Sequence, residues 1–237
     1  MLARLRGRLR RVKHAGEGNL RMPRRALIEK RPWLLASLIA GISFYFVKDA
    51  AMPAPALVAW KGAGVALLAV WALLHPPGPV VLRIGLVMAL GAAGDMLLEW
   101  NQPAGGAAFL LGHLAAIALY LRNRRAEPAG SQRLAAAALL MLTPLLAWQL
   151  TASIPVSLYA AALGGMAASA WLSRFPRYRV GIGAVMFVIS DLLIFAQMGA
   201  LSASPLPATL IWPLYYFGQF LICTGVIGAL RPPPTPR

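Results

Sequence analysis

Acidic residues are scarce in this chain, and so are charged residues in general. Only seven Asp and Glu are present among 237 residues, against 23 Lys and Arg, and charged residues make up 13% of the total. Soluble domains carry about 25% charged and about 45–50% apolar residues. Here 59% are hydrophobic, and the mean hydropathy is +0.66. This composition excludes a soluble enzyme of ordinary type, and its apolar content excludes a disordered chain.

Cysteine and histidine are also scarce, which limits the possible metal sites. Cys223 is the single cysteine, so an intramolecular disulfide and any cysteine-rich metal site are excluded. Of the three histidines, His14 lies in a basic N-terminal stretch, His75 lies in a Pro-rich turn, and only His113 lies in an apolar segment. A three-histidine zinc site is therefore not available in the membrane. We expect no metal and no cofactor; a site that combines His113 with carboxylates is a minor alternative.

The basic residues are distributed as in a membrane protein. The formal net charge is +16, which on one face of a soluble domain would indicate nucleic-acid binding. Eleven of the 23 basic residues instead precede Pro32, and most of the others lie in short gaps between apolar segments. We therefore expect a lipid bilayer, not nucleic acid, as the partner of this charge.

Eight apolar segments, each bounded by Pro, Gly or charge, approach the length of about 20 residues that a transmembrane helix needs. They run over residues 32–47, 55–74, 80–98, 107–121, 133–150, 155–172, 180–198 and 208–230. This pattern predicts an all-α, polytopic membrane bundle of eight transmembrane helices. The protein is then a multi-pass integral membrane protein, in the plasma (inner) membrane if the source is bacterial.

The charges of the connecting loops predict the orientation of the bundle. Arginines fill the gaps on one side, whereas the gaps on the other side hold only Lys48. The positive-inside rule then places both termini in the cytoplasm, as an even number of spans requires. The predicted organisation is a basic, disordered tail over residues 1–31, the bundle over 32–230, and a short tail over 231–237. Translation can begin at Met1 or at Met22.

Few ionisable residues lie inside the predicted spans, and such residues are functional candidates by default. Together with polar neutral companions they reach a similar depth, in the outer half of the membrane, from several helices. We therefore interpret the set as one pocket that faces the bundle interior. The candidates are Lys61, Asp95, His113, Tyr159, Ser190, Asp191, Tyr215 and Gln219.

Two of these candidates, Asp95 and Asp191, are carboxylic acids that share the single lysine, Lys61, as a counter-charge. A neutral carboxylic acid beside an ionised carboxylate is the arrangement that general acid–base catalysis uses. Asp95 also shares a helix face with Glu99, four residues later. The simpler alternative is that Lys61 pairs with one Asp only to neutralise charge between helices.

Several motifs resemble those of the lysoplasmalogenase-like (YhhN) family of integral membrane proteins. The resemblance covers nearly the whole chain from about residue 33 to residue 230, and Lys61 fits the lysine of the family's second span. The family commonly has a proline after this lysine, where this chain has Gly62, and a tyrosine three residues after the histidine, where this chain has Ala116. The matching stretches are Gly94-Asp95-Met96-Leu97-Leu98, Phe109-Leu110-Leu111-Gly112-His113, Pro155 to Tyr159, Gly183 to Asp191, and Tyr215 to Gln219.

This resemblance implies hydrolysis of the vinyl ether bond of lysoplasmalogens (lysoplasmenyl-ethanolamine or -choline) to a fatty aldehyde and a glycerophospho-base. Asp95 and Asp191 are then the expected catalytic residues. Lys61 would keep one of them ionised, and His113 and Tyr215 would position water. Two alternatives stay open: a transporter or proton-coupled carrier, and a non-catalytic lipid-binding protein. The substrate's headgroup and the oligomeric state are not predicted.

Overall fold

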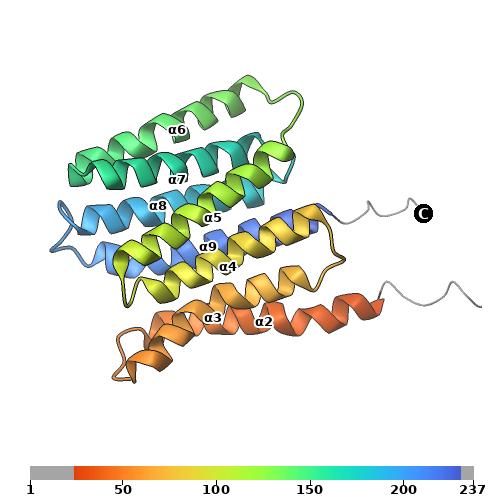
Figure 1. Cartoon of the computed structure of the whole chain (residues 1–237), viewed down its shortest axis with the longest axis horizontal. Helices are drawn as coiled ribbons and strands as arrows, with labels where there is room; N and C mark the ends of the chain where they lie inside the picture. Colours follow the sequence, from red (N-terminus) through yellow and green to blue (C-terminus); the bar gives the residue numbers. More distant parts are fainter. Residues whose placement is uncertain (1–23, 231–237) are drawn as a thin grey trace, which may run out of the picture. The chain divides into compact units, whose positions relative to one another are not determined.

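The computed structural model describes residues 24–230, and these residues form α-helices joined by short loops (Figure 1). Residues 1–23 of the expected tail over 1–31, with His14 and Met22, and the expected tail over 231–237 lie outside them. By their contacts the residues form two units, which divide after Pro32, and all the candidate residues lie in the second. The elements are α2 (Arg24–Val47), α3 (Ala54–Leu73), α4 (Pro79–Leu97), α5 (Gln102–Arg122), α6 (Gly130–Thr151), α7 (Ile154–Leu172), the π-helical turn η1 (Arg177–Gly181), α8 (Ile182–Gln197) and α9 (Leu206–Gly228).

The prediction of an all-helical polytopic membrane bundle is confirmed. Eight α-helices occur in the described residues, and seven of them, α3 to α9, are long and apolar enough to cross a membrane, with η1 continuing into α8. The helix α2 is not among the seven, because charged residues occupy its first third. The chain is a multi-pass integral membrane protein; the count of eight spans and the cytoplasmic termini stay predictions.

Two helices begin five or more residues earlier than the sequence pattern indicated. α5 starts at Gln102 rather than near residue 107, because the Asn101 side chain accepts a hydrogen bond from the Ala104 N–H at 2.9 Å and so caps the helix. α2 starts at Arg24 and includes Pro32, so the last residues of the expected tail are helical. Arg, Ala and Leu are strong helix formers, which favours this extension.

Consecutive helices pack as antiparallel pairs, and α9 joins the α3–α4 pair to the η1–α8 segment. The most extensive contacts are between α3 and α4, α4 and α5, α6 and α7, and α8 and α9. α9 also contacts α3, α4 and η1, and α5 contacts α7. α6 is the least buried of the seven candidate spans, whereas the η1–α8 segment and α9 are the most buried. The residues of α8 and α9 are therefore the best shielded from lipid.

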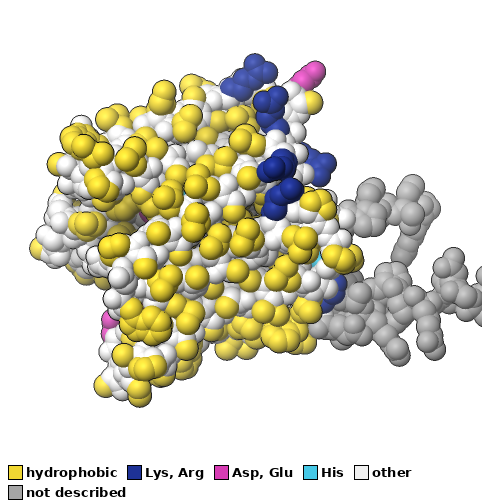
Figure 2. Space-filling model, in the orientation of Figure 1, with side chains coloured by type: hydrophobic (Ala, Val, Ile, Leu, Met, Phe, Trp, Pro, Cys, Tyr) yellow, Lys and Arg dark blue, Asp and Glu magenta, His cyan; other side chains and the backbone are white. Residues whose placement is uncertain are grey.

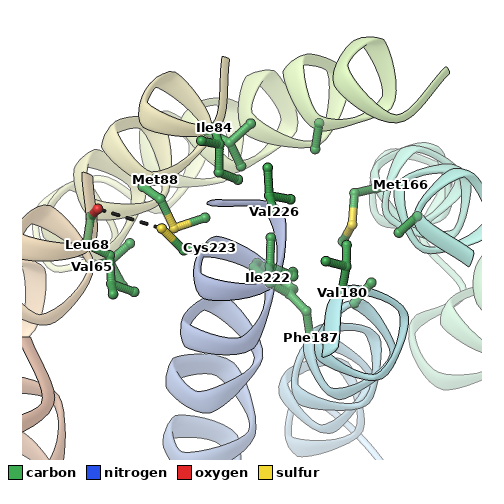
Figure 3. Packing of buried hydrophobic residues seen from close by; sticks show 14 of the residues in the cluster. Val65, Leu68, Ile84, Met88, Met166, Val180, Phe187, Ile222, Cys223 and Val226 are labelled. Atoms are coloured by element: carbon green, nitrogen blue, oxygen red, sulfur yellow. Dashed lines mark hydrogen bonds between the residues drawn. The ribbon is translucent and has the colours of Figure 1, made fainter. Parts of the chain in front are cut away.

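The packed core lies around the second half of α9, where Ile222, Cys223 and Val226 meet residues of α3, α4 and η1–α8 (Figure 3). Cys223 is fully buried, and its Sγ lies 3.7 Å from the Leu68 carbonyl oxygen, to which it donates. Phe187 packs beside Ile222 in the same cluster. The thiol thus serves as a small packing group in this core.

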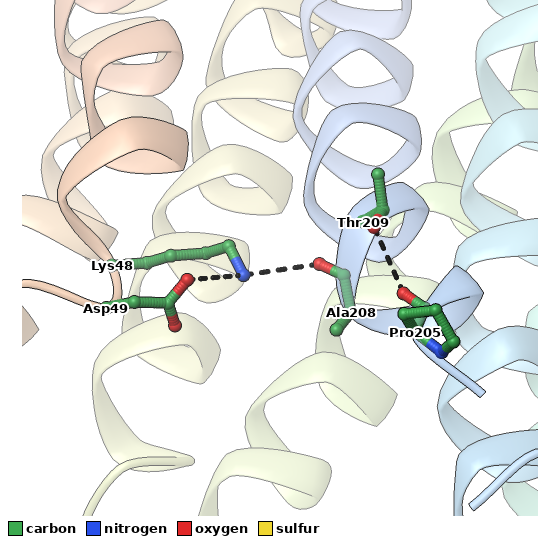
Figure 4. A network of polar contacts seen from close by, with 5 residues as sticks. All are labelled: Lys48, Asp49, Pro205, Ala208 and Thr209. Atoms are coloured by element: carbon green, nitrogen blue, oxygen red, sulfur yellow. Dashed lines mark hydrogen bonds and ion pairs between the residues drawn. The ribbon is translucent and has the colours of Figure 1, made fainter. Parts of the chain in front are cut away.

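Lys48, the one basic residue in the loops that are predicted to lie outside, has local partners that explain its presence. It lies just after α2, and its Nζ is 3.2 Å from Asp49 Oδ2 (Figure 4). The same Nζ donates to the Ala208 carbonyl oxygen at the start of α9, at 3.3 Å. Lys48 therefore links the α2–α3 loop to α9 and does not counter the charge bias on which the predicted orientation rests.

Arginines gather at the end of α5 and the start of α6, where Figure 2 shows Lys and Arg side chains along one edge of the visible face. Arg122, Arg124 and Arg133 are exposed there. The loop that carries them is tied to the loop after α7, because Arg174 N–H donates to the Asn123 carbonyl at 2.8 Å and Arg125 N–H to the Leu172 carbonyl at 3.0 Å. The loops at this end thus hold one another.

Glycines let α8 and α9 approach each other closely, as small residues do in membrane bundles. A Cβ added at Gly183 would lie 2.6 Å from the Gly218 carbonyl oxygen, and one added at Gly218 would lie 2.8 Å from the Gly183 carbonyl oxygen. Because the atom met is backbone in each case, only a shift of a whole helix would relieve the overlap.

Replacing Gly183 by Ala is expected to destabilise the protein by about 1–3 kcal/mol, the usual range for overpacking a close contact. At about 2–4 °C per kcal/mol for a chain of this size, the unfolding midpoint in detergent should fall by several degrees. Gly165→Ala is the control, since a Cβ there would meet the flexible Ile117 side chain at 3.4 Å. An equal midpoint for both variants would contradict the close packing of α8 on α9.

Candidate active site

Most of the predicted site residues line one cavity of about 620 Å³ that is formed by six helices. The rest of its wall is largely apolar and includes Phe109, Ile194, Phe195 and Ile211. This volume lies within the range of about 300–1,000 Å³ that small-molecule sites occupy. The six predicted residues in the lining are Lys61, Asp95, Tyr159, Ser190, Asp191 and Tyr215.

Two buried carboxyl groups face this cavity, and each is held by a tyrosine. Asp95 is 2% exposed and Asp191 6%. The Tyr215 hydroxyl donates to Asp95 Oδ2 at 2.8 Å, and the Tyr159 hydroxyl donates to Asp191 Oδ2, also at 2.8 Å. In each carboxyl group Oδ1 has no hydrogen-bond partner among the described residues. Each aspartate is therefore fixed by one oxygen and has the other free for a ligand.

His113 reaches the site through Tyr159 and does not line the large cavity. Its Nε2 lies 3.0 Å from the Tyr159 hydroxyl oxygen, and its ring contacts Phe187 edge to face with ring centres 5.1 Å apart. Because the Tyr159 hydroxyl donates its hydrogen bond to Asp191, its oxygen is free to accept a hydrogen bond from His113. The result is a directed chain from His113 through Tyr159 to Asp191.

Gln219 has a similar place behind the other aspartate. It is 3% exposed and interacts through its side chain with Tyr215, which in turn holds Asp95. Gly91 makes room for this contact, because a Cβ there would lie 2.9 Å from Gln219 Nε2 and 3.5 Å from Tyr215 Oη. Gly91 thus makes room for polar side chains of the site, whereas Gly183 and Gly218 make room for a neighbouring backbone.

The partner of Lys61 differs from the one expected. Its Nζ pairs with Glu99, and not with either aspartate, although Lys61 and both aspartates line the same cavity. Glu99 lies after the end of α4, which stops at Leu97, so the chain turns there and the helical face shared with Asp95 does not continue. The Lys61 and Glu99 side chains are 20% and 40% exposed, so this ion pair is more exposed than either aspartate.

Ser190 lines the cavity beside Asp191, but its hydroxyl donates to the Ile211 carbonyl oxygen at 3.0 Å. That carbonyl lies two residues before the Pro213 nitrogen, inside α9. The serine therefore ties α8 to α9 next to the carboxyl group. This bond sets the spacing of the two helices at the site.

Aromatic rings fill the space between the two tyrosine–aspartate pairs. The Phe187 ring centre is 5.2 Å from that of Tyr215 and 6.1 Å from that of Phe109. Phe109 lines both the large cavity and a small second cavity that also holds His113 and Gln219. The phenyl ring of Phe109 is thus a shared wall between the two spaces.

Four residues in or near this site were not among the predicted set. Glu99 is the ion-pair partner of Lys61, Phe109 is the shared wall, Trp212 lines the large cavity, and Tyr120 lines the small one. Phe109 begins the motif that ends at His113, and the spacing of four residues puts both on one helix face, so the sequence held a signal for Phe109. Glu99 was noted for its place beside Asp95 but not as the partner of Lys61. For Trp212 and Tyr120 the sequence holds no signal beyond their position in an apolar segment.

The two positions that depart from the family pattern have different surroundings. Gly62 lies outside the lining of the large cavity, and a Cβ there would meet Met96 Sδ at 2.8 Å. Ala116 is buried and lines the small cavity with His113 and Gln219. Among the described residues, no group of three or more His, Cys, Asp or Glu is placed to hold a metal ion.

Comparison with known proteins gives one family and two relatives. The family model of the YhhN family matches residues 57–226. Proteins from Mycobacterium bovis and Mycobacterium tuberculosis, both named lysoplasmalogenase, are each 34% identical to this chain over 180 residues, which span 70% of this chain and 69% of the relative. No solved structure matches the chain. The matched region includes all eight predicted site residues.

Proposed function

Because the chain belongs to the YhhN family, we propose that it is a lysoplasmalogenase-type hydrolase that cleaves the vinyl ether bond of lysoplasmalogens. The products are a fatty aldehyde and a glycerophospho-base. The observation that carries this proposal is the pair of buried carboxyl groups, Asp95 and Asp191, that face one largely apolar cavity inside a membrane bundle.

The chemistry of a vinyl ether requires an acid, a stabilising anion and a positioned water. A proton added to the β-carbon produces an oxocarbenium ion, water captures this cation, and the hemiacetal then collapses to aldehyde and alcohol. Glycoside hydrolysis passes through a similar cation and uses two carboxyl groups for it. In this protein Asp95 and Asp191 divide those roles: one delivers the proton, and the other stabilises the cation and takes a proton from the attacking water.

The hydrogen bonds of the site support this division. Each tyrosine occupies Oδ2 of its aspartate and leaves Oδ1 without a partner among the described residues, so both carboxyl groups are oriented before substrate arrives. A preorganised group does not have to reorient as charge develops, which is the main source of electrostatic catalysis. Lys61 pairs with Glu99 and with neither aspartate, so the tyrosines and not the lysine orient the two carboxyl groups.

A single-chain lipid suits the cavity because its wall is largely apolar and its charged groups are the two aspartates and Lys61. Leu98, Leu110 and Val156 offer contacts for the hydrocarbon tail. Lys61, on the more exposed side of the carboxyl groups, is the group in the lining that suits a lipid phosphate. The substrate would then lie with its vinyl ether between tail and headgroup, at the level of the aspartates.

The position of the polar groups favours a hydrolase over a carrier. A transport path needs polar groups that continue across the membrane. Besides His113, Gln219 and Tyr120, the small cavity is lined by apolar residues such as Met166 and Ile222, and the described core next to it is apolar as well. Apart from the Tyr120 hydroxyl, the polar groups are therefore concentrated around the two aspartates, as a site for a reaction requires.

Aldehyde release by the purified protein in detergent tests the proposal. Lysoplasmenyl-ethanolamine and lysoplasmenyl-choline should both yield a fatty aldehyde, whereas the saturated alkyl-ether analogues should yield none, because they have no double bond to protonate. In D₂O the aldehyde should carry one deuterium on the carbon next to the carbonyl. Absence of that label, or release of fatty acid from an acyl lysolipid at a higher rate, would show that another reaction is catalysed.

A further inference from the structure

The small cavity behind the aspartates has the size of a single water molecule. Its volume is about 10 Å³, close to the about 10–15 Å³ that one water needs. A buried water also needs about three hydrogen-bonding partners. Three polar side chains line this cavity: Tyr120, His113 and Gln219.

Tyr120 carries a buried hydroxyl group for which the described residues offer no partner. The side chain is fully buried, and its Oη has no hydrogen bond. An unsatisfied buried donor costs about 1–3 kcal/mol, so such groups are rare unless a water completes them. A water in the adjoining cavity would accept a hydrogen bond from this hydroxyl.

The hydrogen bonds of His113 leave an acceptor next to the same space. Since Tyr159 donates to Asp191, the contact between His113 Nε2 and the Tyr159 oxygen requires the proton on Nε2. In the neutral ring Nδ1 is then an acceptor, and it has no partner among the described residues. A water that accepts a hydrogen bond from Tyr120 can donate a hydrogen bond to this nitrogen.

Gln219 supplies the third partner. Its Nε2 points toward Gly91 and Tyr215, so its amide oxygen is available to accept the second proton of a water in the cavity. Through its amide nitrogen Gln219 then links the water to Tyr215, whose hydroxyl donates to Asp95.

We propose that the small cavity binds one water, held by Tyr120, His113 and Gln219, and that this water joins the two tyrosine–aspartate pairs into one hydrogen-bond network. Donors and acceptors agree throughout: Tyr120 to water, water to His113 and Gln219, and from these through Tyr159 and Tyr215 to the carboxyl groups. Tyr120 is thus a positioning residue that acts through the water. Its effect on catalysis rests on the proposed function, whereas the water itself does not.

Tyr120→Phe separates a water-bound hydroxyl from an unsatisfied one. With the water present, the variant loses a hydrogen bond, and the unfolding midpoint in detergent should fall by about 2–4 °C. The ¹⁵N resonance of His113 Nδ1 should also move, since the water that donates to it loses one of its partners. In the reaction, kcat should fall about tenfold with KM unchanged, because the substrate contacts stay intact.

Two further variants complete the test. Tyr216→Phe is the matched control: it removes another buried hydroxyl, which pairs with Ser37 at 3.0 Å outside this network, and should leave kcat and the His113 resonance unchanged. Ala116→Val keeps Tyr120 but fills the cavity that Ala116 lines, so it should displace the water and reproduce the His113 shift and the loss of kcat.

A higher midpoint for Tyr120→Phe with an unmoved His113 resonance would show that the hydroxyl is unsatisfied and that no water is bound. If the midpoint and the resonance respond as expected while neither the parent protein nor any variant releases aldehyde, the water is present and the proposed reaction is the part that fails. Where Tyr120→Phe does not fold, the His113 resonance of Ala116→Val decides, since an unchanged signal there overturns the proposal.

Discussion

Replacing Asp191 by Asn lowers the rate of aldehyde release by about a thousandfold, and replacing Asp95 by Asn does the same. General acid–base catalysis contributes about 10²–10⁴-fold, and an amide at either position can neither deliver the proton nor accept one from water. Asn has nearly the shape of Asp and still accepts the tyrosine hydrogen bond, so the fold is kept. The rate is measured as kcat with lysoplasmenyl-ethanolamine in detergent.

Asp49→Asn is the control for these two variants. Asp49 is a carboxylate in the loop after α2, 85% exposed and outside the cavity lining, so its loss should leave kcat unchanged. A comparison of the unfolding midpoints shows whether the site variants are folded. Full turnover by folded Asp95→Asn and Asp191→Asn would rule out the mechanism with two carboxyl groups.

Gly106→Trp blocks the cavity and lowers kcat/KM by about a hundredfold. Gly106 lines the cavity, and a Cβ added there meets nothing within 4 Å, so an indole can enter the space without disturbing the backbone. If it denies three to four methylenes of the tail their contacts, at about 0.8 kcal/mol each, about 3 kcal/mol of binding is lost. The loss should appear mainly in KM, because the aspartates are untouched.

Gly130→Trp provides the matched substitution. Gly130 also has open space around an added Cβ, but it begins α6 and lies outside the cavity. Both variants replace a helical glycine, so neither should lose stability through helix propensity. If both variants retain the KM of the parent protein, the substrate tail does not lie in this cavity.

The grouping of the site could be predicted because depth in a membrane follows directly from position along a span. Asp95, Tyr159, Asp191 and Tyr215 lie on four different helices, and the rise per residue places them at a similar level before any packing is known. Which side chain pairs with which depends on helix rotation, which spacing alone does not supply. The two tyrosine–aspartate pairs emerge only with the structure.

The pairing of Lys61 shows why the rest could not be predicted. From the sequence, Asp95 and Asp191 share it as a counter-charge, and Glu99 lies at the outer end of its span. The end of α4 at Leu97 frees Glu99 to turn toward the lysine, and a more exposed pair costs less desolvation than a buried one. Helix ends are the least certain part of a prediction from sequence, so an outcome that depends on one was out of reach.

The buried Cys223 makes this chain a ready background for site-directed thiol labelling. Its sulfur is packed in the core against Leu68, out of reach of polar maleimides, and it is the single cysteine. A cysteine introduced at an exposed glycine such as Gly130 would therefore be the reactive thiol of the folded protein. Impermeant reagents applied to intact cells then report which side of the membrane each loop occupies, without first removing a native residue from the core.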